Sequence, residues 1–177
     1  MRKNVAILVV NPVNGIGLFQ YLETLYENKI PYKTFAVAET TGVRTNSGIL
    51  IQTDDTVAGL KQNSDDFQAL VFSCGDAMPK FVENADKPFN QDMLAVIGRF
   101  AAKGHMLVGH CVAALLFDNF SECKGKKVAQ HPFIKPLLTR CVGTNEEFVV
   151  DRNMFTARDE NTLPKLMPKL LEALQAE

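Results

Sequence analysis

The chain has 177 residues, of which 46% are hydrophobic and 22% are charged, and its 19 basic and 20 acidic side chains leave a formal net charge of -1. This length suits one domain with a sizeable core. The balanced charge excludes charge-driven binding of nucleic acid or anionic lipid. The first apolar run, Val5–Val10, is too short to span a bilayer, and no secretion signal is visible. We therefore expect a single domain over residues 1–177, located in the cytoplasm, with no nucleic-acid or membrane partner.

The cysteine and acidic residues give no metal motif. Four cysteines occur without CxxC spacing: Cys74, Cys111, Cys123 and Cys141. A cytoplasmic chain of this length needs no disulfide framework, so free thiols are expected. Three pairs of adjacent acidic residues lie away from any plausible ligand cluster and are interpreted as solvated surface. The sequence thus predicts neither a metal nor a cofactor.

The first part of the chain alternates between strand and helix patterns. Val5–Val10 is a continuous apolar run closed by Asn11-Pro12, which is typical of a strand buried on both faces. Apolar residues then recur at helical spacing until Pro31 ends the pattern. The expected elements are, in order, a strand at 5–10, a helix at 15–28, a strand at 33–38, a hairpin at 41–53 and a polar connection at 54–66.

The second part continues the alternation. The expected elements are a strand at 69–73, helical stretches around 79–83 and 90–103, a strand at 106–109, a buried helix at 112–120, strands at 127–129 and 138–142, a hairpin at 148–157 and a helix at 163–174. Pro168 should kink that last helix. Strands alternating with helices predict an α/β fold, a three-layer α/β/α sandwich around a mostly parallel sheet of six or seven strands.

The segment MLVGHCVAALLF, residues 106–117, places Cys111 between a predicted strand and a predicted helix. In parallel sheets, catalytic groups collect beyond the carboxyl ends of the strands. Unpaired N–H groups at a helix start favour the thiolate and lower the pKa of a cysteine below its free value of about 8.5. The alternative is a buried cysteine that acts as a small apolar residue. The flanking residues favour the reactive thiol.

These flanking residues carry a family resemblance. MLVGHCVAALLF and the later GKKVAQHPFIK resemble the strand–Cys–helix elbow and the G-x-K-V-x-x-H-P segment of the ThiJ/PfpI superfamily, which includes PfpI-type intracellular peptidases and a Parkinson-associated deglycase. VAILVV resembles the family's opening strand, ALVFSCGD its oxyanion-loop strand, and EEFVVDRNMFTARDENTLPKLMPKLLEAL its closing hairpin and helix. The resemblance runs from Lys3 to about Leu174. It implies a flavodoxin-like, class I glutamine amidotransferase-like fold and a homo-dimer or larger homo-oligomer.

The resemblance also implies roles around the thiol. Cys111 matches the family's reactive cysteine, and the backbone amides of Gly75 and Val112 match its oxyanion hole. Such donors lower the barrier to carbonyl addition by roughly 3–4 kcal/mol each. Cys74 and Asp76, which flank Gly75, are expected to line the same pocket.

Two partners of the family's thiol are absent from this sequence. Peptidase-like members carry Cys-His-Gly at the elbow, where this chain has Cys111-Val112-Ala113. Members also tend to carry a glutamate after the first strand, and the matching position is Gly17. His131 and His110 are the remaining candidates for moving protons. Alternation along a strand directs His110 away from the sulfur unless the elbow twists.

Gly15 and Gly17 lie at the start of the first predicted helix. Their spacing is similar to a dinucleotide-binding loop, but Gln20 stands where the third glycine belongs and no clear acid follows the second strand. A steric role is preferred, in which the two glycines leave space over Cys111 and widen its pocket.

Cys74 has two possible roles. If strands 69–73 and 106–109 are neighbours, Cys74 and Cys111 lie at one sheet edge, on strands about 4.8 Å apart. Oxidation of Cys111 to a sulfenic acid would then be resolved by Cys74 in a redox switch. The plainer interpretation is that Cys74 is a small filler in place of a glycine.

The sequence therefore predicts a cysteine-dependent hydrolase or small-carbonyl enzyme, of glyoxalase or deglycase type, with an incomplete catalytic constellation. Its substrate would be a small molecule or a peptide, with Cys111 as nucleophile and His131 moving protons. The alternative is a non-hydrolytic thiol redox sensor or ligand-binding module that uses Cys111, with or without Cys74. A structural relic with an unreactive pocket is a third hypothesis.

Overall fold

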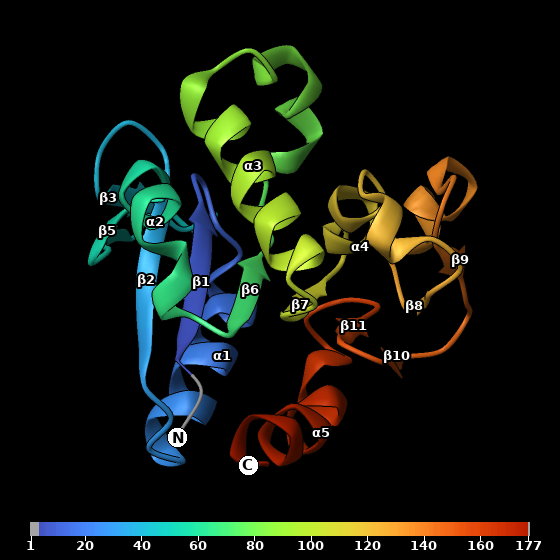
Figure 1. The fold of residues 1–177 in the computed structure, drawn as a ribbon. Helices are drawn as coiled ribbons and strands as arrows, with labels where there is room; N and C mark the ends of the chain where they lie inside the picture. The colour runs from blue at the N-terminus through green and yellow to red at the C-terminus, as the bar shows by residue number, and fades with distance from the viewer. Residues whose placement is uncertain (1–3, 177) are drawn as a thin grey trace.

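A seven-stranded sheet runs through the middle of the computed structural model, which describes residues 4–176 (Figure 1). Its strands are β1 (Val5–Val10), β2 (Tyr32–Val37), β5 (Asp55–Thr56), β6 (Ala69–Ser73), β7 (Met106–His110), β10 (Phe148–Asp151) and β11 (Met154–Ala157). They lie in the order β10-β11-β7-β6-β1-β2-β5. Every neighbouring pair is parallel except β10 with β11, an antiparallel hairpin. The predicted mostly parallel sheet is confirmed.

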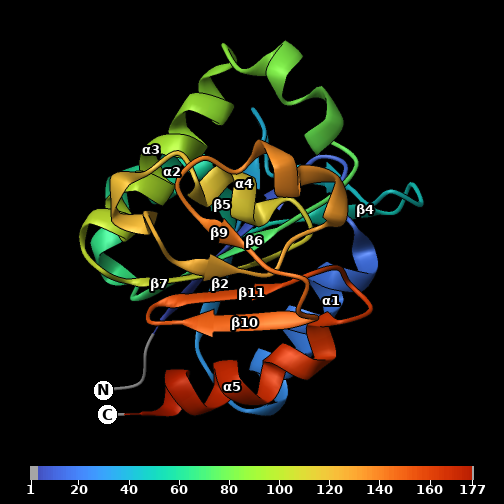
Figure 2. The ribbon, with the colours of Figure 1, turned by 90° about the vertical axis from the view of Figure 1, so that its right-hand side faces the viewer.

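Helices cover both faces of this sheet, as Figure 2 shows. One layer holds α1 (Gly15–Glu27) and α5 (Leu163–Gln175), and the other holds α2 (Val57–Asn63), α3 (Pro88–Ala102) and α4 (Ala113–Phe117). The predicted three-layer α/β/α architecture is therefore confirmed. None of the helices between residues 4 and 176 combines the length and apolar character needed to cross a bilayer.

The central strands and helices form where the sequence pattern places them. Every residue of β1, β6 and β7 is buried, because helices cover a parallel sheet on both sides and its strands become continuous apolar runs. On α1, the buried side chains of Leu18, Tyr21 and Leu25 repeat at three and four residues and form one face against the sheet. These strands and α1 hold the loops at the carboxyl edge of the sheet.

The prediction of a polar connection at 54–66 is wrong. Residues Val57–Asn63 form α2, preceded by the short edge strand β5. Only Val57 and Leu60 of this helix are buried, one turn apart. Two apolar contacts are too few to give a periodic signal among polar neighbours, so tertiary packing decides that the segment is helical.

The prediction of a strand at 138–142 is also wrong for most of these residues. Only β9 (Val142–Gly143) pairs, in parallel, with β8 (Lys127–Val128). The carboxylate of Asp118 accepts the backbone N–H groups of residues 139, 140 and 141 at 2.8, 2.8 and 2.6 Å. Because these donors are bound by a side chain, no strand ladder can use them.

The remaining expectations differ in detail. The hairpin expected at 41–53 forms as β3 (Gly42–Arg44) and β4 (Leu50–Gln52). The helical stretch around 79–83 is two short 3₁₀ turns, Met78–Lys80 and Val82–Asn84. Helix α5 continues through Pro168 as one element.

Candidate functional site

Cys111 lies at the turn between β7 and α4 with a left-handed backbone, at φ 59°. A non-glycine residue in this region is strained, and such strain concentrates at functional sites. Two hydrogen bonds hold the turn: Cys111 donates its N–H to the Ala157 carbonyl at 3.2 Å, and the His131 N–H donates to the Cys111 carbonyl at 3.0 Å. The strand-to-helix elbow expected from the sequence is present.

The helix after the elbow is shorter than expected. A helix over 112–120 was predicted, but α4 spans only Ala113–Phe117. A macrodipole is the sum of aligned peptide units, so five residues supply little of it. The pKa of Cys111 is still lowered from its usual value, and the causes are local.

The first local cause is the neighbouring thiol. β6 and β7 are parallel neighbours, and the register that pairs Phe72 with Gly109 brings Cys74 and Cys111 to one edge of the sheet. Both are free thiols, and their side chains hydrogen-bond to each other. This bond is the largest cause that lowers the pKa of Cys111, and it also raises the pKa of Cys74 well above its usual value. The arrangement suits a Cys111 thiolate that accepts the S–H of a neutral Cys74.

The amides expected to form an oxyanion hole point at sulfur. The N–H groups of Gly75 and Val112 hydrogen-bond the Cys74 sulfur, and that of Val112 also bonds Cys111. These donors favour the thiolate and lower the pKa of Cys74, although the hydrogen bond to Cys111 and burial outweigh them. A Cβ on Gly75 would lie 2.3 Å from the Pro12 carbonyl oxygen, so the close approach of the loop after β1 requires glycine here. The amides that the resemblance assigns to an oxyanion hole therefore lie beside the Cys74 sulfur.

His110 is packed into the core with only 1% of its surface exposed. Its Nδ1 lies 3.2 Å from the Tyr21 hydroxyl, and its Nε2 has no partner among residues 4–176. Burial lowers the pKa of His110 to about 4, so the ring is neutral at pH 7. This position links α1 to the end of β7.

The steric role expected for Gly15 and Gly17 is corrected by this packing. A Cβ on Gly17 would lie 2.5 Å from His110 Nε2, so the imidazole fills the space left by the glycine. A Cβ on Gly15 would meet Thr45 Cγ2 at 3.4 Å. Neither glycine lines the cavity above Cys111, because the hydrogen bond to Tyr21 holds the His110 ring against α1.

His131 lies on the opposite side of the elbow backbone and is exposed. Its Nδ1 accepts the Phe133 N–H at 3.3 Å, which leaves Nε2 to carry the proton of the neutral ring. The structure brings His131 to the same cavity as Cys111.

A cavity of about 330 Å³ opens above Cys111, near the lower end of the range for small-molecule sites. It is lined by Asn14, Asn46, Cys74, Gly75, Asp76, Met78, Pro79, His110, Cys111, Val112, His131, Phe133, Ile134 and Glu160. The site residues Cys74, Gly75, Asp76, His110, Val112 and His131 are therefore brought together around Cys111. Within the described part of the chain, no three His, Cys, Asp or Glu side chains are grouped to hold a metal ion.

Glu160 is a cavity residue that the sequence analysis missed. It lies in the loop between β11 and α5, and its charge raises the pKa of Cys111 against the effect of Cys74. Its loop is fixed because Gln20 Nε2 donates to the Glu160 carbonyl at 3.1 Å. The sequence carried no local signal for it. In the structure β11 pairs with β7, Ala157 lies opposite His110, and the residues that follow the two strands meet at one edge of the sheet.

Known proteins share the sequence and the fold of this chain. The sequence matches the DJ-1/PfpI family over residues 3–173. Protein ppBat of Bacteroides thetaiotaomicron is 52% identical over 175 residues, covering 99% of this chain and 100% of the relative. A crystal structure named "putative protease I" from Bacteroides thetaiotaomicron has a TM-score of 0.96 at 52% identity and covers 98% of this chain and 99% of that one.

More distant structures share the fold. A DJ-1 superfamily protein from Salmonella typhimurium has a TM-score of 0.83 at 21% identity, covering 97% of this chain and 90% of that one. Oxidised DJ-1 from Toxoplasma gondii has a TM-score of 0.82 at 16% identity, covering 98% and 91%. The match over almost the whole chain, together with the elbow cysteine and its loop glycine, leads to one conclusion: this chain belongs to the DJ-1/PfpI family.

Proposed function

We propose that this chain is a thiol redox protein, in which Cys111 reacts with a small hydroperoxide and Cys74 resolves the product as a disulfide. The observation that carries the proposal is the meeting of two free thiols in one cavity, where Cys74 lowers the pKa of Cys111 and the amides of Gly75 and Val112 lower the pKa of Cys74. A hydrolase needs those amides for a substrate oxygen. Here they stabilise a negative charge on either sulfur.

The first step is attack by the Cys111 thiolate on the terminal oxygen of the hydroperoxide. A sulfur–oxygen bond forms, the oxygen–oxygen bond breaks, and the alkoxide takes one proton and leaves as the alcohol, or as water from hydrogen peroxide. The sulfur is oxidised to a sulfenic acid and the peroxide is reduced. Because Cys111 lines the cavity and its pKa is lowered, it is the sulfur suited to begin.

The second step joins the two sulfurs. Loss of the Cys111 negative charge removes the largest cause that raises the pKa of Cys74, while the Gly75 and Val112 amides remain in place. Cys74 then loses its proton, its thiolate attacks the sulfenic sulfur, and hydroxide leaves with that proton as water. One disulfide and one water are the products.

His131 is proposed to deliver the proton to the leaving alkoxide. It lines the same cavity, and its neutral ring carries the proton on Nε2 while Nδ1 accepts the Phe133 N–H. An exposed imidazole can be reprotonated from water between cycles.

The test is to oxidise the fully reduced protein with stoichiometric hydrogen peroxide and map its cysteines by mass spectrometry. We expect a Cys74–Cys111 linkage that dithiothreitol reverses. In Cys74→Ala, Cys111 should instead progress to sulfinic acid, because nothing resolves the sulfenic acid. Cys123→Ala is the matched control and should form the same linkage as the unaltered protein. Absence of the linkage, with Cys111 still reduced, would reject the proposal.

A second candidate is the cysteine-dependent hydrolase or small-carbonyl enzyme. The contact of the Val112 N–H with Cys111 favours it, because this donor lies beside the atom that would attack a carbonyl. For this activity the Cys74 sulfur must move away from the N–H groups of Gly75 and Val112, so that they can bind the substrate oxygen. Turnover of ester, peptide or glyoxal-type substrates that is lost in Cys111→Ser and reduced in His131→Ala would support this activity.

A further inference from the structure

The charged side chains of the Cys111 cavity are nearly all of one sign. Two of its lining residues carry carboxylates, Asp76 and Glu160, and no lysine or arginine lines it among the described residues. Among the described lining residues, the basic side chains are the imidazoles of His131 and of the buried His110. A Cys111 thiolate would add a further negative charge to the same space.

The two carboxylates flank the thiol. In the sheet order, β7 lies between β11 and β6. Glu160 follows β11 by a short loop, Cys111 follows β7 directly, and Asp76 follows β6. Because parallel strands end at one edge, the acidic residues stand on either side of the sulfur.

Both acidic positions are fixed by the surrounding structure. The Gln20 side chain binds the Glu160 carbonyl at 3.1 Å, and the Asp159 carboxylate accepts the Asn161 and Thr162 N–H groups at 3.0 and 2.9 Å. The Asp76 N–H donates to the Asn46 side-chain oxygen at 3.2 Å. These contacts fix the backbone of both loops at the cavity that Glu160 and Asp76 line.

The nearest cation in the sequence does not neutralise this charge. Arg158 directs its Nε to the Asp159 carboxylate at 3.3 Å and does not line the cavity. The carboxylate of Glu160 makes no ion pair within residues 4–176, and neither does that of Asp76. Low-dielectric walls concentrate such a field inside a cleft.

From this arrangement we infer that the Cys111 cavity selects cationic and neutral electrophiles and excludes anionic ones, through the paired carboxylates of Asp76 and Glu160. The inference rests on the proposed reactivity of Cys111 and names its substrate class: small hydroperoxides or disulfides that carry an ammonium group or no charge. Carboxylate-bearing peroxides and anionic thiols such as glutathione are disfavoured, which leaves Cys74 as the resolving thiol.

The experiment measures how fast Cys111 is modified by three methanethiosulfonates that differ in charge. One carries a trimethylammonium group, one a sulfonate and one only a methyl group. Each rate is divided by the rate at which the same reagent reacts with free 2-mercaptoethanol, which corrects for the reagent's own reactivity. Peptide mapping identifies the modified cysteine. We expect the normalised cation-to-anion ratio to be about 10 or more at low salt and to fall towards 1 as salt is added.

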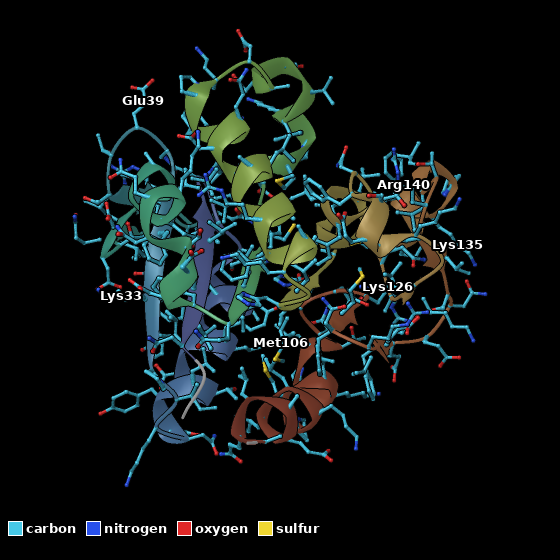
Figure 3. The ribbon with its side chains drawn as sticks, viewed as in Figure 1. Lys33, Glu39, Met106, Lys126, Lys135 and Arg140 are labelled. Atoms are coloured by element: carbon cyan, nitrogen blue, oxygen red, sulfur yellow. The ribbon has the colours of Figure 1, made fainter. Side chains whose placement is uncertain are left out.

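Substitutions then assign the ratio to the two carboxylates. Glu160→Gln and Asp76→Asn should each lower the ratio by roughly threefold, and the double variant by roughly tenfold. Glu160→Asp, which keeps the charge, should restore most of it. Glu39→Gln is the matched control: this exposed residue lies on the loop after β2, away from the cavity lining, and its loss should leave the ratio unchanged (Figure 3).

The outcomes separate this inference from the proposed function. A normalised ratio near 1 with rapid labelling of Cys111 overturns the charge selection and leaves the redox proposal intact. Failure of all three reagents to label Cys111 overturns both. If Glu160→Gln changes the rates of all three reagents by the same factor, Glu160 acts only by changing the fraction of Cys111 that is thiolate. This outcome also overturns the charge selection.

Discussion

The chain holds two pairs of neighbouring free cysteines, and only Cys111, in the first pair, has a lowered pKa. Cys74 and Cys111 meet at the cavity, and the pKa of Cys111 is lowered by the Cys74 S–H. Cys123 and Cys141 meet inside the domain, where the Cys141 thiol donates to the Cys123 carbonyl at 3.5 Å. Burial raises the pKa of Cys123 and raises that of Cys141 to about 12.

The difference teaches that a neighbouring thiol or cation alone does not activate cysteine. Lys126 lies near the second pair and its charge lowers both pKa values, yet burial prevails. In the first pair, an S–H donor and a backbone N–H both reach Cys111, and the cavity leaves it partly exposed. Cys74 also receives N–H donors, yet its pKa is raised, so donors combined with partial exposure distinguish Cys111 from the buried thiols.

The strongest test of this comparison is the labelling of the native protein. Burial raises the pKa of Cys141 to about 12, whereas the pKa of Cys111 is lowered from its usual value by its neighbour Cys74. At pH 7.5 the thiolate population of Cys111 should exceed that of Cys141 by about 1000-fold, and iodoacetamide labelling should follow it. Quantitative peptide mapping checks this. Similar labelling of the two pairs would end the distinction.

The effect of burial can be measured separately on His110. Its pKa is about 4 in the folded chain against 6.5 for the free group, so the unfolded chain binds more protons between these values. The free energy of unfolding should therefore fall by about 3 kcal/mol as pH decreases from 7 to 4. Urea unfolding across this range measures the loss. His110→Gln should flatten this part of the profile, whereas His105→Gln, its half-buried counterpart, should not.

The packing that buries His110 gives a smaller expected effect. Gly17→Ala places a Cβ 2.5 Å from His110 Nε2 and should reduce the free energy of unfolding by about 2 kcal/mol. Gly15→Ala is the control, because its Cβ reaches Thr45 only at 3.4 Å and the change should be neutral or slightly stabilising. Chemical denaturation of both variants provides the comparison. Equal changes in the two variants would mean that the contact with the imidazole does not determine the result.

The smallest expected effect comes from removing the thiol of Cys74 that interacts with Cys111. Cys74→Ala removes the largest cause that lowers the pKa of Cys111, so this pKa should rise and iodoacetamide labelling at pH 7 should slow by roughly tenfold. The pH dependence of the labelling rate measures the shift. Cys123→Ala should leave the profile unchanged. A profile that is unaltered in Cys74→Ala would assign the lowered pKa to the Val112 amide alone.

The sequence predicted the parts of the fold whose residues repeat regularly. The buried strands and helix α1 were found, whereas α2 was missed because only Val57 and Leu60 anchor it. The strand at 138–142 was wrong because Asp118, some twenty residues earlier, takes the backbone donors of that segment. Regular periodicity is local information, but a side chain that binds a distant backbone leaves no periodic trace.

The sequence by itself determined the layered fold and the elbow at Cys111, because apolar runs show which residues follow a strand; that Cys74 lies beside Cys111 was settled by the pairing of β6 with β7. Only the tertiary structure decided three further contacts. The Cys74 sulfur lies beside the N–H groups of Gly75 and Val112, and the His110 ring fills the space over Gly17. Glu160 reaches the cavity. The physical reason is distance along the chain. Each of these contacts joins loops from different strands, and their relative positions are set only when the sheet and both helical layers pack together.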